Sequence, residues 1–243
     1  MNFKHFLQES YISKYKSDIE LPDAVDLINQ YCKNVSFDKP LVRGMNGGKD
    51  AYILDGSLRD RKSRTKINYH TIIIDHIIKN INDTYPLRSK SIICTTLDDL
   101  WATERFGPDV YAIFPYDGST IAYMTKHSDM NALPLTVGNS NMRMRDIKYK
   151  LSDAKINDNS FKDIVNDIKK EIKNENHDLI KIFDDEDKVE QYLLNAFSPE
   201  HIGYDFGSIK DMYKNKAYGE CWMNCKAIAI KYSIWEKMKK END

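Results

Sequence analysis

Apolar residues recur along the chain at helical spacing in some stretches and as short runs in others. After Leu21-Pro22-Asp23, where a proline early in the first turn favours a helix start, helical spacing continues to about residue 34. We expect the N-terminal stretch up to that point to be helical, and residues 68–81 to form another helix. Short apolar runs bounded by glycine or polar residues predict strands. These strands are expected over residues 40–44, 51–54, 91–96, 110–115, 119–124, 217–223 and 227–232.

Two turns between neighbouring strands predict hairpins. Asp117-Gly118 lies between two apolar runs, and this dipeptide strongly favours a hairpin turn. A second hairpin is expected around Asn224, with Glu220 in its first arm.

The remaining segments are polar or charged. A helix is expected over residues 97–107, because Thr96 is a good N-cap and Gly107 a good stop. Residues 141–215 are charged and mostly at helical spacing, which predicts a helical insertion, and a last helix is expected over residues 234–240. The pattern as a whole predicts one α+β domain over residues 1–243.

Composition narrows the class of protein. The chain is 41% hydrophobic and 30% charged, with 36 basic and 37 acidic residues, so it is globular and has no general attraction for nucleic acid or membrane. The first residues lack the apolar run of a signal peptide, and no run of about eighteen apolar residues occurs. We expect a cytoplasmic protein with no membrane partner, its four cysteines reduced and no metal bound.

Three polar elements stand on predicted strands. Arg43, followed by Gly44, ends the first; Cys94-Thr95-Thr96 ends another; Glu220 lies in the apolar run Tyr218–Met223. Each has an ordinary explanation as a surface residue, a helix N-cap or a solvent-facing carboxylate. A glutamate inside a strand is nevertheless unusual, because burial of its charge is costly.

Together, in this order, the elements resemble the Arg–Ser–Glu, toxin-like class of ADP-ribosyltransferases, and the region from Pro86 to Gly118 resembles uncharacterised phage proteins related to it. The resemblance covers about residues 40–125 and 215–232. It implies an α+β fold of split mixed or antiparallel sheets that form a cleft. It also implies NAD as substrate and a macromolecular acceptor, which for a phage protein would be a host protein in the host cytoplasm.

The resemblance implies a role for each element. Arg43 with Gly44 would bind the NAD diphosphate, because a planar guanidinium pairs well with phosphate. Glu220 would be catalytic, stabilising the oxocarbenium ion that forms when the nicotinamide–ribose bond breaks. Thr95 or Thr96 would bind the ribose or hold Glu220. The nicotinamide ring needs an aromatic wall, for which Tyr69, Trp101 and Tyr111 are candidates.

The sequence departs from the family pattern at three points. The central motif is Cys-Thr-Thr rather than Ser-Thr-Ser, and the insertion is long. Tyr218 stands where arginine-modifying members carry a carboxylate or amide, so arginine as acceptor is in question. Glu200 is a reserve candidate for the catalytic carboxylate, although its setting is that of a helix start.

Two other functions stay open. The chain could be a catalytically silent relative that uses the same scaffold for binding. It could instead bind or process nucleic acid through a local group of basic residues: Arg59, Arg61, Lys62, Arg64, Arg88 and Lys90.

Overall fold

The computed structural model describes residues 15–59, 67–98, 100, 108–127, 130 and 133–242. Its strands are β1 (Lys16–Ile19), β2 (Leu41–Met45), β3 (Ala51–Asp55), β4 (Ile92–Thr96), β5 (Asp109–Pro115), β6 (Ile121–Met124), β7 (Pro134–Val137), β8 (Ser140–Arg143), β9 (Tyr204–Gly207), β10 (Glu220–Met223) and β11 (Lys226–Lys231). Its α-helices are α2 (Leu21–Tyr31), α3 (Tyr69–Ile81), α4 (Met144–Asp153), α5 (Phe161–Lys173), α6 (His177–Ile182), α7 (Val189–Ala196), α8 (Pro199–Ile202), α9 (Ile209–Lys214) and α10 (Tyr232–Asn242). Short 3-10 helices are η1 (Gly56–Leu58), η2 (Arg88–Lys90) and η5 (Glu186–Lys188).

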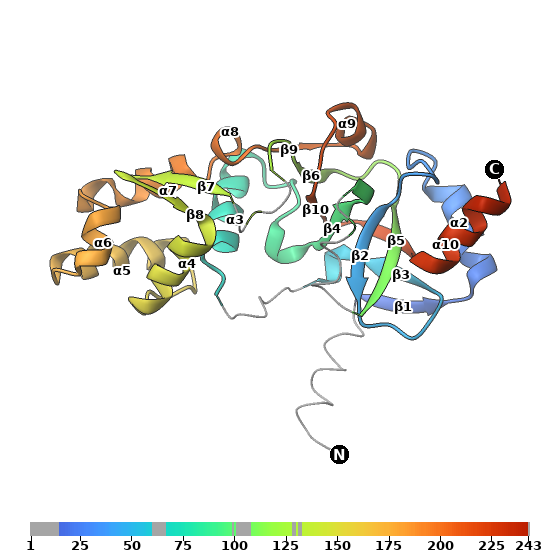
Figure 1. The fold of residues 1–243 in the computed structure, drawn as a ribbon, viewed down its shortest axis with the longest axis horizontal. Helices are drawn as coiled ribbons and strands as arrows, with labels where there is room; N and C mark the ends of the chain where they lie inside the picture. The colour runs from blue at the N-terminus through green and yellow to red at the C-terminus, as the bar shows by residue number, and fades with distance from the viewer. Residues whose placement is uncertain are drawn as a thin grey trace, which may run out of the picture.

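The fold is mixed α+β, as the sequence predicts. In the part of the chain that is described, nine strands form one antiparallel sheet in the order β1-β3-β11-β5-β2-β4-β10-β6-β9, and β7 and β8 form a separate pair. Figure 1 shows the sheet in the middle of an elongated molecule, with α2 and α10 at one end and α4 to α7 at the other. Within the same residues, no helix is both long and apolar enough to cross a bilayer.

Two hydrophobic cores lie on either side of the β4-β10-β6 part of the sheet. Strand alternation sends neighbouring side chains to opposite faces, so Trp222 packs in a core with α3 and the insertion helices, while Cys221 and Met223 pack in a core with α2 and α10. Because Ile93 of β4 joins the first core and Ile92 the second, this part of the sheet is buried on both faces.

The contact between β2 and β4 is the shortest strand pairing in the sheet. Only Leu41 and Val42 of β2 pair with β4, opposite Thr96 and Thr95, whereas all five β2 residues pair with β5. Beyond Val42 the two strands separate. The Arg43 guanidinium donates a hydrogen bond to the Ile93 carbonyl oxygen there, in place of a backbone partner on β2.

The sequence-based prediction of two hairpins is wrong, because neither pair of consecutive strands is hydrogen-bonded to each other. β5 pairs with β11 and β2, while β6 pairs with β10 and β9. In the same way β10 pairs with β4 and β6, and β11 with β3 and β5. Both turns carry the chain from one part of the sheet to another, and they meet where Tyr116 N–H donates to the Lys226 carbonyl at 3.0 Å.

Local structure explains why Asp117-Gly118 forms a turn without a hairpin. Gly118 has a φ of 78°, a left-handed conformation that suits glycine. The Asp117 carboxylate accepts hydrogen bonds from the Lys33 and Asn34 N–H groups, at 3.0 and 2.8 Å, just after α2. The aspartate therefore ties the turn to α2 rather than closing a hairpin.

Replacing Asp117 by alanine is expected to lower the free energy of unfolding by about 1–2 kcal/mol, because two backbone N–H groups lose their acceptor. Urea unfolding followed by circular dichroism measures this change. Asp83→Ala, at an exposed position between α3 and η2, is the control and is expected to change stability by less than about 0.5 kcal/mol. Equal stabilities of the two variants would show that the Asp117 contacts contribute nothing.

Two further expectations need correction. Residues 16–19, predicted to be helical, form the edge strand β1, because they pair with β3 between Lys16↔Leu54 and Ile19↔Ala51. The predicted insertion is mostly helical from α4 to α8, but it also contains β9, which pairs with β6 and so belongs to the main sheet. The helix expected over residues 97–107 falls largely outside the described residues.

Candidate functional site

The three strands that carry the candidate residues are neighbours in the sheet. β4 lies between β2 and β10, and one row of paired residues crosses all three strands: Val42, Thr95 and Glu220. Residues directly opposite each other in an antiparallel pair have their side chains on the same face. Thr95 and Glu220 therefore share a face, although 123 residues of sequence lie between β4 and β10.

The start of β10 is also fixed to the end of β4 by hydrogen bonds. The Gly219 N–H donates to the Thr96 hydroxyl at 2.9 Å, and the Thr96 N–H donates to the Gly219 carbonyl at 3.0 Å. Gly219 has a φ of 93°, which an L-residue with a side chain rarely adopts. The glycine before Glu220 thus lets β10 begin at this point, and Thr96 positions it.

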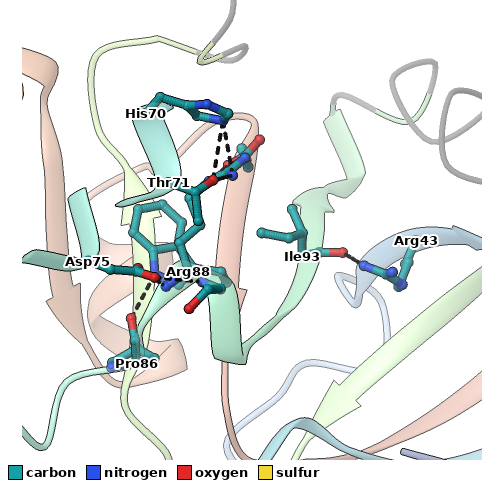
Figure 2. Close-up of polar contacts among 10 residues, drawn as sticks. Arg43, His70, Thr71, Asp75, Pro86, Arg88 and Ile93 are labelled. Carbon is teal, nitrogen blue, oxygen red and sulfur yellow. Dashed lines mark hydrogen bonds and ion pairs between the residues drawn. The ribbon is translucent and has the colours of Figure 1, made fainter. Parts of the chain in front are cut away.

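Arg43 lies on the other face of the row. It follows Val42, so alternation places it with Cys94 and Tyr111 rather than with Thr95 and Glu220. Figure 2 shows its guanidinium reaching the Ile93 carbonyl from the β2 side of β4, away from Arg88. Its neighbour Gly44 is buried in β2 opposite Val110.

The Arg43 side chain is buried but incompletely bonded. The residue is 7% exposed, and its Nε–H is a buried donor without a hydrogen-bond partner. Among the described residues no carboxylate forms an ion pair with it. Burial raises the pKa of the neighbouring Cys94 thiol to about 12, although the charge of Arg43 acts in the opposite direction, so a neutral thiol faces this cation. A buried guanidinium with an unused donor is unusual, because buried polar groups are normally hydrogen-bonded.

Glu220 forms an ion pair that the sequence did not predict. Arg88, from η2, donates from Nε and Nη2 to the same carboxylate oxygen, Oε1, at 2.9 and 2.8 Å. The two side chains are 3% and 12% exposed. No described residue donates a hydrogen bond to Oε2, so the second oxygen is available to a ligand.

Figure 2 shows further polar groups of α3 around Arg88. Arg88 Nη1 donates to the Thr71 hydroxyl at 2.8 Å and lies 3.2 Å from His70 Nε2. The Asp75 carboxylate accepts the Arg88 and Ser89 N–H groups at 2.6 and 3.1 Å. Burial raises the pKa of Asp75, and these hydrogen bonds oppose that shift. Sequence reasoning missed this cluster, because only the fold brings η2, α3 and β10 together.

The remaining candidates are placed as follows. The Tyr69 ring is 5% exposed, and its hydroxyl donates to the Ile156 carbonyl at 2.6 Å, so it packs in the core beside the insertion. Tyr111 is fully buried and donates to the Lys49 carbonyl at 2.9 Å. Neither ring offers a surface for stacking, and Trp101 lies outside the described residues. Glu200 is in the first turn of α8, where Ser198 caps the helix.

The basic residues that were predicted to bind nucleic acid do not all lie on one exposed surface. Arg88 is buried and bound to Glu220, so it is not available to a nucleic-acid phosphate. The Arg59 guanidinium lies over the Tyr15 ring, 4.2 Å from its centroid. Residues 61, 62 and 64 lie outside the described part of the chain. In the part that is described, no cluster of three or more histidine, cysteine or acidic residues could hold a metal ion.

Comparison of the chain with protein-family models, with curated proteins and with solved structures finds no match.

Proposed function

We propose that the protein is an NAD-dependent ADP-ribosyltransferase that cleaves the nicotinamide–ribose bond and transfers ADP-ribose to a macromolecular acceptor. The observation that carries this proposal is the row Val42–Thr95–Glu220 across β2, β4 and β10. Since β10 follows a long insertion, its pairing with β4 is independent of the local sequence that suggested Glu220.

Glu220 and Arg43 suit different parts of NAD, and because they lie on opposite faces of the sheet, one NAD molecule reaches both only by lying across the gap where β2 and β4 separate beyond Val42. On one side, Glu220 keeps Oε2 available to accept a hydrogen bond from a ribose hydroxyl and to stabilise the positive charge that develops on the ribose. On the other, Arg43 has no described carboxylate partner, so its positive charge suits a diphosphate, and its buried Nε–H is reached only if the ligand displaces neighbouring side chains. Thr95 and Thr96 end β4, which lies between the strand of Arg43 and the strand of Glu220. Tyr69 has no role in the proposed site.

The primary test is incubation of the purified protein with NAD labelled in the nicotinamide ring. We expect nicotinamide release without an added acceptor, since water can replace the acceptor, and faster release when the true acceptor is present. An absence of both nicotinamide release and NAD binding would exclude the proposed function.

One observation favours a second candidate, a silent relative that binds a ligand or partner without turnover. The Arg88 ion pair neutralises Glu220 inside the protein, and a catalytic carboxylate usually needs its charge for the substrate. Saturable NAD binding with no nicotinamide release would favour this candidate.

Replacing Arg43 by lysine is expected to weaken NAD binding by about 10- to 100-fold. Lysine keeps the charge but lacks the planar fork, and a charge-assisted hydrogen bond contributes about 1.5–3 kcal/mol. Titration calorimetry measures the affinity. Arg145→Lys is the matched control, because Arg145 is exposed and its partner Asp146 is also exposed. An Arg43→Lys protein that is folded and binds NAD like wild type would remove Arg43 from the proposed site.

A further inference from the structure

The segment that carries Arg88 is anchored on both sides. Asp75 of α3 accepts its backbone N–H at 2.6 Å, and Trp222 of β10 donates from Nε1 to the Pro86 carbonyl at 2.8 Å. The Ser91 hydroxyl donates to the Leu87 carbonyl at 2.6 Å. These contacts fix the backbone of η2 relative to both α3 and the strand that bears Glu220.

The Arg88 side chain is fixed as firmly as its backbone. All three guanidinium nitrogens have partners: Nε and Nη2 on Glu220 Oε1, and Nη1 on Thr71. The side chain is 3% exposed, so it does not exchange these partners for water as a surface arginine would.

This geometry orients the carboxylate of Glu220. Two donors on one oxygen prevent rotation of the carboxylate about its last bond, because rotation would break both hydrogen bonds. Oε2 is then held in one direction with no described donor. A surface-facing carboxylate without such support samples many orientations, and a misplacement of about 1 Å can cost about a hundredfold in rate.

We propose that Arg88 is a positioning residue for Glu220: it binds Oε1 through two N–H groups and directs Oε2 toward the ribose of NAD. This inference rests on the proposed function. It assigns to Arg88 a role in catalysis through Glu220, with no direct contact to the substrate.

The test is steady-state nicotinamide release by the full chain, with kcat and KM measured separately. Arg88→Gln is expected to lower kcat by about a hundredfold while the KM for NAD changes by less than about threefold. Arg88→Lys keeps the charge but has a single donor nitrogen in place of the planar guanidinium, so it should lose less activity than Arg88→Gln. The double variant Arg88→Gln/Glu220→Gln should be no slower than Glu220→Gln alone, because positioning acts only through that carboxylate.

Controls separate positioning from a purely structural role. Arg145→Gln, on an exposed arginine, is expected to match wild type. Thermal unfolding of each variant shows whether it is folded at the assay temperature. If Arg88→Gln is not folded there, the kcat and KM of Arg88→Lys are compared with those of wild type instead.

Two outcomes overturn the inference while the proposed function stands: an unchanged kcat in a folded Arg88 variant, whether or not KM rises, or additive losses in the double variant. Faster release by Arg88→Gln than by wild type also overturns it, since Arg88 would then restrain Glu220. If wild type binds no NAD and releases no nicotinamide, the proposed function fails, and this inference fails with it.

Discussion

Replacing Glu220 by glutamine is expected to lower the rate of nicotinamide release by about 10²- to 10³-fold, the usual cost of removing one electrostatic stabiliser of a transition state. Glutamine has nearly the same shape, and its carbonyl oxygen can still accept hydrogen bonds from Arg88. For the reaction itself, the missing negative charge matters chiefly when positive charge develops on the ribose. NAD affinity is therefore expected to stay within about threefold of wild type.

The substitution also leaves Arg88 as a buried cation without its counter-ion. Breaking a buried pair in this way costs about 3–5 kcal/mol, and the partial exposure of Glu220 reduces the cost. Rates are therefore compared at a temperature where circular dichroism shows both proteins to be folded.

Glu200→Gln is the matched control for this prediction, because Glu200 was the other carboxylate that the sequence offered. It lies at the start of α8, and its own carbonyl oxygen accepts from Lys126 Nζ at 2.6 Å. We expect wild-type rates from this variant. If Glu200→Gln is inactive and Glu220→Gln is not, the wrong carboxylate has been assigned.

Replacing Trp222 by alanine is expected to lower the free energy of unfolding by about 3–5 kcal/mol, the usual range for removing a large buried aromatic side chain. Trp222 is fully buried in the core between β10 and the insertion, and its ring lies 5.7 Å from that of Tyr204, centroid to centroid. Urea unfolding followed by far-ultraviolet circular dichroism measures the change.

Trp222→Phe separates the role of the indole N–H from that of the ring. Phenylalanine keeps most of the apolar surface but loses the bond to the Pro86 carbonyl, so a loss of about 1–3 kcal/mol is expected. Because Pro86 lies two residues before Arg88, nicotinamide release should also fall.

Trp235→Phe is the matched control. Trp235 is also buried, and its Nε1 donates to the Phe37 carbonyl at the same 2.8 Å, but it lies in the core beside α2 and α10. A similar loss of stability with unchanged activity is expected. If both variants lose activity equally, the effect of Trp222 on η2 is refuted.

Spacing along the chain predicted most helices and strands, because apolar periodicity is a local property. α2, α3 and the main strands lie close to their expected positions. The choice of which strands pair in the sheet was predicted less well. Asp117-Gly118 has the residues of a hairpin turn, yet Asp117 binds N–H groups after α2, and no local pattern shows that competing contact.

The candidate site shows the same limit. Arg43, Thr95 and Glu220 could be selected from the sequence, because the first two are polar residues at the end of an apolar run and Glu220 is a charged residue inside one. Arg88 was grouped instead with surface basic residues, since nothing in its immediate sequence indicates burial. Its pairing with Glu220 depends on a sheet that brings together residues 132 positions apart.

The described part of the main sheet contains no hairpins, and this affects how the chain folds. Among the described strands of that sheet, no two neighbours are consecutive in the sequence, so every pairing closes a loop that contains at least one other strand. Topologies dominated by such distant contacts fold slowly, in milliseconds to seconds, because loop entropy is lost before contacts compensate for it. β11 lies between β3 and β5, so during synthesis the sheet stays open at that position until residues 226–231 leave the ribosome. In the interval β3 and β5 expose unpaired edges, which leaves the incomplete chain open to edge-to-edge association with other chains.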